Sequence, residues 1–202
     1  MVSPMHASPD PLPDRRAAVA TLLRDRDNTL VITGLGSPTY DVHAAGDRAD
    51  TFYLWGAMGG AALVGLGLAQ AQPSRRVLVI TGDGEQLMAM GSLATVAVAA
   101  PRNLTVVVID NQHFGETGMQ ASHTGRGVDL AGVAAACGFA ATGTLTTLAA
   151  VEALRGTLAE PAAGPRLYVV RVTADNPARS LPSRDAVLIK TRFRAHLGLT
   201  PG

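Results

Sequence analysis

Short runs of apolar and β-branched residues alternate with longer helix-like stretches along most of this chain. The short runs cover 29–34, 76–82, 104–110, 139–145 and 166–172, and the longer stretches cover about 57–72, 85–100, 128–137 and 147–159. Strand-like runs that are separated by helix-like stretches indicate strand–helix–strand units. The pattern therefore predicts an α/β fold, a doubly wound and mainly parallel sheet with helices on both faces.

The length of the chain, 202 residues, is sufficient for one domain with a full core and short for two. Residues 1–14 are rich in proline and polar groups, and we expect a flexible leader there. The α/β domain is expected to cover residues 15–176. Residues 177–202 begin with a proline-bounded arm, which a short amphipathic helix follows.

One uncharged segment, 51–74, is about as long as a helix that crosses a bilayer. Its early Gly56 and the Gly59-Gly60 pair are unfavourable for a lipid-facing helix, and helices buried against parallel sheets are also rich in small residues. We therefore expect a buried helix here and no membrane association. The chain opens without the pattern of a secretory signal, which favours the cytoplasm.

The composition excludes several classes of site. Seventeen basic and sixteen acidic residues give a net charge of +1 without a long run of either sign, so we expect no nucleic-acid binding. Lys190 is the only lysine, and its surroundings match neither a Schiff-base site nor a phosphate-binding loop. Cys137 is the only cysteine, which excludes an internal disulfide and a cysteine-clustered metal site.

Three of the predicted strands end in small or polar residues, in the sequences GLGS (34–37), GDG (82–84) and DN (110–111). The carboxyl ends of parallel strands meet at one edge of the sheet, where ligands of this fold class bind. Glycine at a strand end lets backbone N–H groups approach an anion, and a following helix adds its N-terminal dipole. The sequence GDG therefore favours a diphosphate site.

Asp83 is an acidic residue at the position where the backbone of this predicted site approaches the phosphates. A carboxylate beside phosphates is repulsive unless a cation lies between them, and Mg²⁺ prefers oxygen ligands. The side chain of Asn111 and the backbone carbonyl of His113 supply further oxygens, and two diphosphate oxygens and a water complete an octahedron. We therefore predict a Mg²⁺–diphosphate site at adjacent strand ends.

The sequence GDG (82–84) followed by Asn111 resembles the cofactor motif of the thiamine-diphosphate-dependent 2-oxoacid decarboxylases. The second half of that motif is usually Asn-Asn. Here Asp110 replaces the first Asn. The second Asn, which is the metal ligand of the family, is kept as Asn111, so the resemblance implies that cofactor binding is retained.

A second match, WGAMGG (55–60), extends the resemblance upstream. It implies that the carbonyl of Gly56 accepts from the aminopyrimidine and that Met58 wedges the cofactor into its bent form. The likeness covers roughly residues 28–197 and is greatest to the β subunit of sulfopyruvate decarboxylase and the C-terminal half of phosphonopyruvate decarboxylase. The implied cofactor-binding residues are Gly36, Ser37, Gly56, Met58, Gly82, Asp83, Gly84, Glu85, Asn111, Gly115, Glu116 and Thr117.

Enzymes of this family place the cofactor between a diphosphate-binding domain and a pyrimidine-binding domain, and this chain resembles only the first. The pyrimidine domain normally supplies the glutamate that activates the cofactor. The four glutamates of this chain, Glu85, Glu116, Glu152 and Glu160, lie outside such a context. The resemblance thus implies a hetero-oligomer with a pyrimidine-domain subunit, and a chain that is inactive alone.

The implied substrate is sulfopyruvate or phosphonopyruvate, a small 2-oxoacid whose anionic group requires polar or cationic contacts. The loop after Asn111 offers Thr117, Gln120, Ser122, His123 and Arg126. Of these, His123 is our candidate for a contact with the substrate.

Three alternative functions for the chain stay open. A 2-oxoacid oxidoreductase β chain shares the motif, although one cysteine disfavours its iron–sulfur partners. An acetolactate-synthase-like carboligase shares it too, usually within one long chain. A dinucleotide-binding regulatory module on GLGSPT would need Thr39 where the third glycine belongs.

Overall fold

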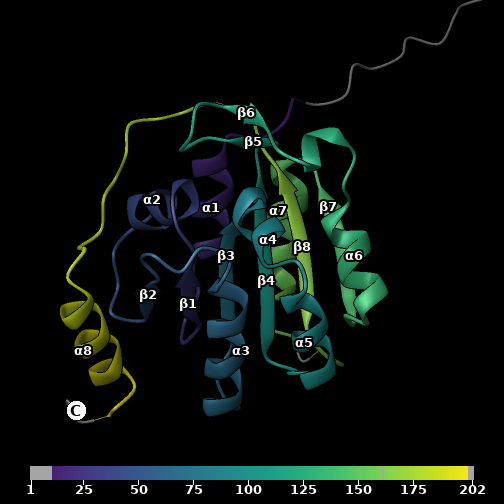
Figure 1. The fold of residues 1–202 in the computed structure, drawn as a ribbon. Helices are drawn as coiled ribbons and strands as arrows, with labels where there is room; N and C mark the ends of the chain where they lie inside the picture. Colours follow the sequence, from purple (N-terminus) through teal and green to yellow (C-terminus); the bar gives the residue numbers. More distant parts are fainter. Residues whose placement is uncertain (1–10, 161, 200–202) are drawn as a thin grey trace, which may run out of the picture.

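The computed structural model describes residues 11–160 and 162–199, so most of the expected leader lies outside the described residues. Six parallel strands form the central sheet in the order β2-β1-β3-β4-β8-β7 (Figure 1). In chain order they are β1 (Leu30–Thr33), β2 (Thr51–Tyr53), β3 (Val77–Gly82), β4 (Leu104–Asp110), β7 (Ala141–Leu145) and β8 (Arg166–Arg171). The predicted fold class is confirmed, and all five predicted strands are present to within two residues at each end.

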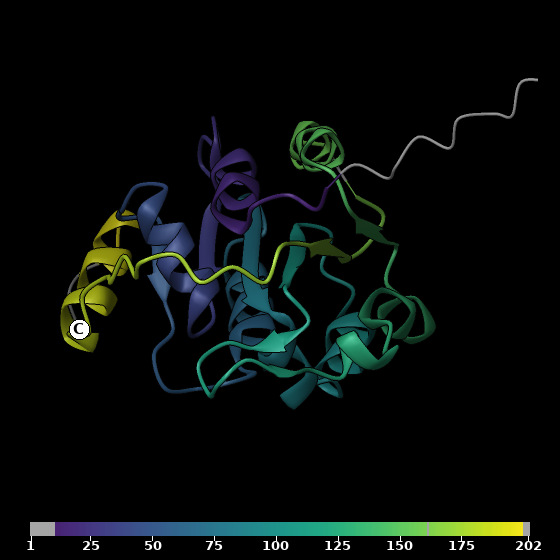
Figure 2. The ribbon, with the colours of Figure 1, turned by 90° about the horizontal axis from the view of Figure 1, so that it is seen from above.

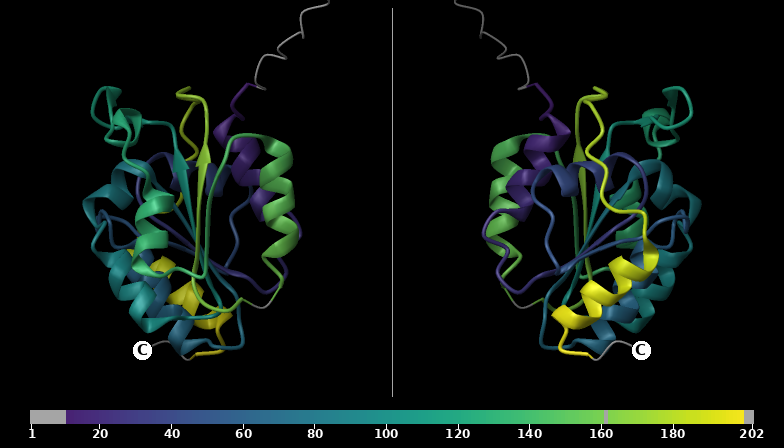
Figure 3. Two further views of the ribbon diagram at one scale, coloured as in Figure 1. Left: turned by 90° about the vertical axis from the view of Figure 1, so that its right-hand side faces the viewer. Right: turned by 90° about the vertical axis from the view of Figure 1, so that its left-hand side faces the viewer.

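Helices cover both faces of this sheet (Figure 3). One face carries α1 (Arg15–Leu23), α2 (Ser37–Ala44) and α7 (Leu148–Thr157). The other carries α3 (Ala61–Ala71), α4 (Asp83–Met88), α5 (Ser92–Ala99) and α6 (Leu130–Cys137). A last helix, α8 (Ala186–His196), packs on the edge strand β2. Each face has its own buried apolar cluster, as expected for a doubly wound sheet.

The register of the central strands positions the predicted site. Gly82 of β3 pairs with Ile109 of β4, so the two strands end at the same level. Every residue of β4 is buried. Asp83 and Asn111 follow these two strand ends directly, and they therefore emerge at one edge of the sheet, as predicted.

Several elements differ from the prediction. The sequence pattern did not indicate α1, α2 or the three-residue β2. The predicted helix 57–72 begins only at Ala61, because Gly56 and Gly59 have φ of +80° and +84°, outside the helical region. The predicted helix 85–100 is divided into α4 and α5, and Ala89 between them is not helical. No helix in the described ranges combines the length and apolar character needed to cross a membrane.

Two irregular segments lie over the carboxyl edge. The first is the loop after β4, which contains the hairpin β5 (His113–Phe114) and β6 (Gln120–Ala121) and the short helix η1 (Thr124–Arg126). The second is residues 173–185, here called the strap, which crosses the molecule from β8 to α8 (Figure 2). Hydrogen bonds tie the strap to α1, to α2 and to Trp55. The proposed domain boundaries at residues 14 and 176 stay predictions.

Candidate functional site

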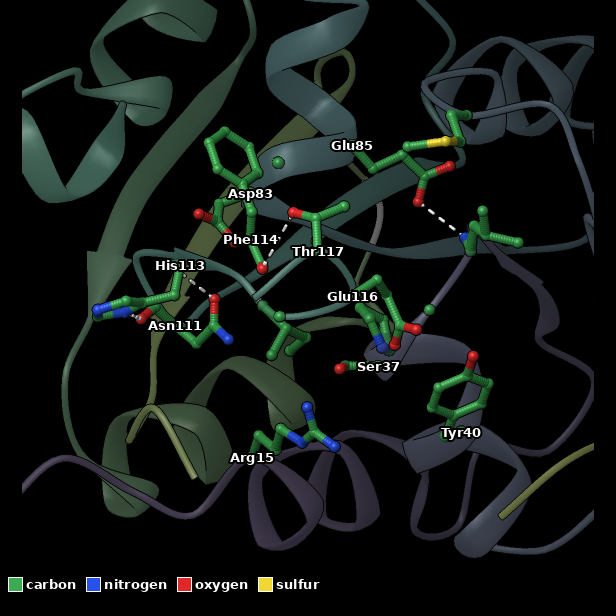
Figure 4. Close-up of a pocket in the computed structure, with 18 of the residues that line it drawn as sticks. Arg15, Ser37, Tyr40, Asp83, Glu85, Asn111, His113, Phe114, Glu116 and Thr117 are labelled. Atoms are coloured by element: carbon green, nitrogen blue, oxygen red, sulfur yellow. Dashed lines mark hydrogen bonds between the residues drawn. The ribbon is translucent and has the colours of Figure 1, made fainter. Parts of the chain in front are cut away.

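A cavity of about 350 Å³ opens at the carboxyl edge, beyond the ends of β1, β3 and β4 (Figure 4). Of the predicted site residues, all except Gly56 and His123 line it. These are Gly36, Ser37, Met58, Gly82, Asp83, Gly84, Glu85, Asn111, His113, Gly115, Glu116 and Thr117. The sequence analysis did not name the other lining residues, which are Arg15, Leu35, Pro38, Tyr40, Met88, Ile109 and Phe114.

Asp83 is a buried acid at the start of α4. Its Oδ2 accepts hydrogen bonds from Ser122 Oγ at 2.5 Å and Thr124 Oγ1 at 3.2 Å. Burial is the main cause that raises the pKa of Asp83 to about 6; the hydrogen bond from Ser122 acts against it, and the charge of Asp110 adds to it. The ion pairs of the described residues do not include Asp83. A cation placed next to Asp83 would favour its ionised form.

Asp110, which replaces the usual first Asn of the motif, is fully buried behind the cavity wall. Its carboxylate accepts from Gln112 N–H at 2.9 Å and Thr124 Oγ1 at 2.8 Å, and it forms an ion pair with Arg171 at 3.3 Å. Asp110 therefore orders the loop after β4 and joins it to β8. Its partners are all within the protein, and the neighbouring Asn111 is the residue that reaches the cavity.

The turn after Asn111 brings both residues that were predicted to supply oxygens, Asn111 and His113, to the cavity wall, and the His113 carbonyl accepts from Gly115 N–H at 3.1 Å. Gln112 has a φ of +62°, so the chain reverses at this point. Asn111 Oδ1 accepts from His113 N–H at 3.0 Å, and His113 Nδ1 lies 2.8 Å from the carbonyl oxygen of Asn111. These contacts hold Asn111 and His113 in one compact turn beside Asp83 (Figure 4).

The loop after β1 forms the opposite wall. Gly36 has a φ of +72° and precedes α2, which begins at Ser37 with Pro38 in its first turn. Proline suits this position because a first-turn N–H has no partner within the helix. Thr39 is buried, and its hydroxyl donates to the carbonyl of Gly34 at 2.7 Å. Thr39 thus stabilises the turn from inside, while the free N-terminus of α2 faces the cavity.

Glu85 lines the cavity but is engaged by the protein itself. Its carboxylate accepts from Leu35 N–H at 2.9 Å, Thr81 Oγ1 at 2.9 Å and Gly59 N–H at 3.2 Å. Burial raises the pKa of Glu85, and the hydrogen bond from Leu35 N–H acts in the opposite direction. The side chain therefore joins three walls of the site, a role that the sequence motif did not reveal.

The rim of the cavity is apolar on one side and acidic on the other. Met58 and Met88 line the cavity and are 53% and 62% exposed. Glu116 also lines the cavity, lies over Gly36 and forms an ion pair with Arg179 of the strap at 3.0 Å. The strap therefore holds the loop after β4 in place above the α2 wall.

His123 does not line the cavity, and its ring packs edge-on against Phe114 at 6.1 Å between centroids. Of the other polar residues in that loop, Ser122 points inwards to Asp83.

Arg15 and Tyr40 are lining residues that the sequence analysis missed, because both belong to helices that it did not predict. One sequence signal was present, since Asp14 is a favourable N-cap and its side chain accepts from Ala17 N–H. This signal could have located the start of α1, but nothing in the sequence indicates that Arg15 reaches the cavity.

Comparison with known families supports the resemblance seen in the sequence. Residues 36–172 match the family model described as thiamine pyrophosphate enzyme, C-terminal TPP binding domain. The chain belongs to this family. Thiamine pyrophosphate is thiamine diphosphate, and the matched residues include Gly36, the GDG turn, Asn111 and the loop after β4.

Curated relatives of this family member are decarboxylases by name. Sulfopyruvate decarboxylase subunit beta of Methanocaldococcus jannaschii is 39% identical over 112 residues, 55% of this chain and 59% of the relative. Phosphonopyruvate decarboxylase of Streptomyces viridochromogenes is 40% identical over 195 residues, 94% of this chain and 47% of the relative. The chain thus spans about half the length of these relatives. It covers 94% of sulfopyruvate decarboxylase subunit beta of Methanococcus maripaludis, at 31% identity.

Solved structures show the same fold at low sequence identity. A putative thiamin diphosphate-dependent enzyme from Mycobacterium smegmatis superposes with a TM-score of 0.67 at 22% identity. A thiamine diphosphate-dependent 4-hydroxybenzoylformate decarboxylase from Rhodococcus jostii superposes with a TM-score of 0.67 at 18% sequence identity. In both cases the match covers 85% of this chain and 34% of the solved chain.

Proposed function

We propose that this chain is the diphosphate-binding β subunit of a split thiamine-diphosphate-dependent decarboxylase in the cytoplasm. It acts with Mg²⁺ and with a partner subunit that carries the pyrimidine-binding domain. The substrate is a small 2-oxoacid with an anionic group on C3, sulfopyruvate or phosphonopyruvate. The reaction is non-oxidative and yields the aldehyde and CO₂.

The observation that carries this proposal is the setting of Asp83. It is a buried acid without an ion-pair partner among the described residues, and it lines a cavity beside Asn111 and His113. Carboxylate, amide and carbonyl oxygens form the donor set that Mg²⁺ prefers. The residues therefore fit a Mg²⁺ ion that bridges the protein to a diphosphate: Asp83, Asn111 and the His113 carbonyl would hold the metal.

The glycine residues of the site also fit a diphosphate. A Cβ on Gly84 would lie 2.9 Å from the ring of Phe114, so a larger residue would displace Phe114, which also lines the cavity. Gly36 and Ser37 place the N-terminus of α2 on the same cavity, where its N–H groups favour an anion. When bound, thiamine diphosphate supplies the nucleophilic carbon and the electron sink for decarboxylation.

A partner subunit is supported by the positions of the four glutamates. Glu85 is engaged by three donors of the protein, and Glu116 pairs with Arg179. Glu152 lies on α7 and pairs with Arg24 and Arg155, and Glu160 is exposed beyond the end of α7. None of these four positions offers a free carboxylate at the mouth of the cavity, so the activating glutamate is assigned to the partner.

The apolar rim gives that partner a surface to cover. Met58, Leu63, Met88 and Met90 are all more than a third exposed and belong to the segments around α3 and α4. Exposed methionines that border a cavity are typical of contact surfaces, because the thioether side chain adapts to its partner. We assign this rim to the pyrimidine-domain subunit.

Calorimetric titration tests the cofactor assignment. We expect thiamine diphosphate to bind the purified chain only with Mg²⁺, and NAD not to bind. Asp83→Ala should abolish Mg²⁺-dependent binding, because the variant loses the acidic metal ligand. Asp175→Ala, which removes an exposed acid of the strap outside the cavity, is the matched control. Unchanged affinity in Asp83→Ala would contradict the metal assignment.

A turnover assay tests the split-enzyme assignment. The chain with thiamine diphosphate and Mg²⁺ should leave sulfopyruvate and phosphonopyruvate unchanged until the pyrimidine-domain subunit is added. Rapid CO₂ release by the chain alone would show that the activating group lies within it.

A further inference from the structure

Arg15 places a buried positive charge at the cavity. It is the first residue of α1 and only 2% exposed, yet its side chain lines the cavity. Figure 4 shows its guanidinium extending from α1 towards the space between Asn111 and Ser37. The family match begins at residue 36, so Arg15 lies outside it.

This charge is only partly compensated within the protein. Arg15 Nε lies 3.1 Å from Asp41 Oδ2, and Arg16 Nε lies 3.2 Å from Oδ1 of the same carboxylate. One buried acid is thus shared by two guanidinium groups. Arg15 Nη1 is buried and has no hydrogen-bond partner among the described residues. A buried cation is costly unless it is paired and hydrogen-bonded, so an anion bound at this corner of the cavity would complete the pairing of Arg15.

Two independent features point into that same corner. The first is the N-terminus of the eight-residue helix α2, which begins at Ser37, has no side-chain cap and lines the cavity. The second is the unpartnered guanidinium nitrogen of Arg15. Guanidinium and helix N-terminal N–H groups both favour phosphate oxygens, since the fork of an arginine matches two oxygens of one phosphate.

We propose that Arg15, together with the start of α2 at Ser37, binds the terminal phosphate of a diphosphate ligand. This inference rests on the proposed function for the identity of the natural ligand, thiamine diphosphate. The Arg15 site gives the cavity its selectivity for a diphosphate, because a ligand with a single phosphate at the Asp83 metal site has no group that reaches Arg15.

Titration with inorganic diphosphate and Mg²⁺ tests this assignment without thiamine and without turnover. Arg15→Met should weaken diphosphate binding at least about tenfold, as expected for the loss of charge-assisted hydrogen bonds. Arg16→Met is the matched control, since it removes the other guanidinium on Asp41 and does not line the cavity. We expect its affinity to stay within about twofold of the unmodified chain.

A double variant covers the case in which Arg15→Met does not fold. Arg15→Met/Asp41→Asn removes the buried pair as a unit, which is less costly than leaving one buried charge unpaired. It should show the same loss of diphosphate affinity, with its fold checked by thermal unfolding. Thiamine monophosphate should bind the unmodified chain and both Arg15 variants equally.

Inorganic diphosphate that binds the Arg15 variants as tightly as the unmodified chain would overturn the assignment. So would the absence of Mg²⁺-dependent diphosphate binding to the unmodified chain. A wrong proposed function would give a different result. Inorganic diphosphate would still bind the unmodified chain more tightly than the Arg15 variants, whereas thiamine diphosphate would bind the unmodified chain no more tightly than inorganic diphosphate does.

Discussion

The carboxylate of Glu85 is the contact whose removal we expect to loosen the cavity most. Its three donors are Leu35 N–H in the loop after β1, Thr81 Oγ1 at the end of β3, and Gly59 N–H before α3. One side chain therefore connects three walls of the site. Glu85→Ala leaves two backbone N–H groups without their acceptor in a part of the protein that is largely buried.

The magnitude of this loss follows from the three contacts. Hydrogen bonds to a charged acceptor contribute about 1.5–3 kcal/mol each, and a buried donor without a partner costs about 1–3 kcal/mol. The alanine variant also removes a buried charge, and relief of its desolvation offsets part of the loss. We therefore expect a net decrease of about 3 kcal/mol in the free energy of unfolding, which lowers Tm by roughly 6–12 °C in a chain of this length.

Gly34→Ala should break the same contacts from the other side. A Cβ on Gly34 would lie 1.7 Å from Glu85 Oε2, so the methyl group and the carboxylate cannot occupy their places together. The φ of Gly34 is not in the left-handed region, and the backbone itself accepts alanine. The three atoms nearest to this methyl group all belong to the Glu85 carboxyl group, and Glu85→Ala removes them. The two substitutions should therefore be coupled by about 2–3 kcal/mol.

Urea unfolding of the unmodified chain, both single variants and the double variant measures this coupling. Gly67→Ala in α3 is the control, because its Cβ would meet nothing within 4 Å, and alanine favours a helix by about 0.5–1 kcal/mol. If the costs of Gly34→Ala and Glu85→Ala simply add, the carboxylate does not connect these walls as described.

Three further predictions concern the strap, α8 and the metal site. Burial is the largest single influence on the pKa of Asp47 and raises it, but the hydrogen bonds from Arg192 and Tyr53 together with the charge of Arg192 lower it overall. The stabilisation is therefore present above the ordinary value of 3.8 and is lost as the pH falls through the folded value. Asp47→Asn should cost about 0.5–1 kcal/mol in urea unfolding at pH 7 and nothing in strong acid; an equal cost at both pH values would contradict this. Arg179→Ala should speed hydrogen exchange in the strap, while exchange in β4 stays unchanged. Ser122→Ala should weaken Mg²⁺-dependent cofactor binding about tenfold, because Asp83 loses an orienting donor; equal calorimetric affinity would argue against that role.

The sheet could be predicted from the sequence because its central strands β1, β3 and β4 are buried on both faces and therefore appear as continuous apolar runs. The helices were harder to place. In 85–100 the residues around the break, Met88, Ala89 and Met90, are all good helix formers, so composition does not reveal it. The same holds for β2, whose three residues merge with the apolar segment that follows.

The residues that we propose for the metal could be located at one edge of the sheet because they stand within a few positions of two strand ends. The roles of Glu85 and Arg15 could not. Glu85 acts on Leu35 and Gly59, and Arg15 reaches the cavity from a helix that packs against α2 and α7. Both roles depend on long-range packing, which a local motif does not encode.

The charges around the cavity impose a direction on any ligand. Glu116 has Arg179, and Asp110 has Arg171, so these acids are compensated within the protein. Asp83 has hydroxyl partners and no ion pair among the described residues, and Arg15 has only a shared acid. Figure 4 places Asp83 and Arg15 on different sides of the cavity. A ligand that carries a cation at one end and an uncompensated phosphate at the other satisfies both, which a bare anion or a bare metal ion cannot do.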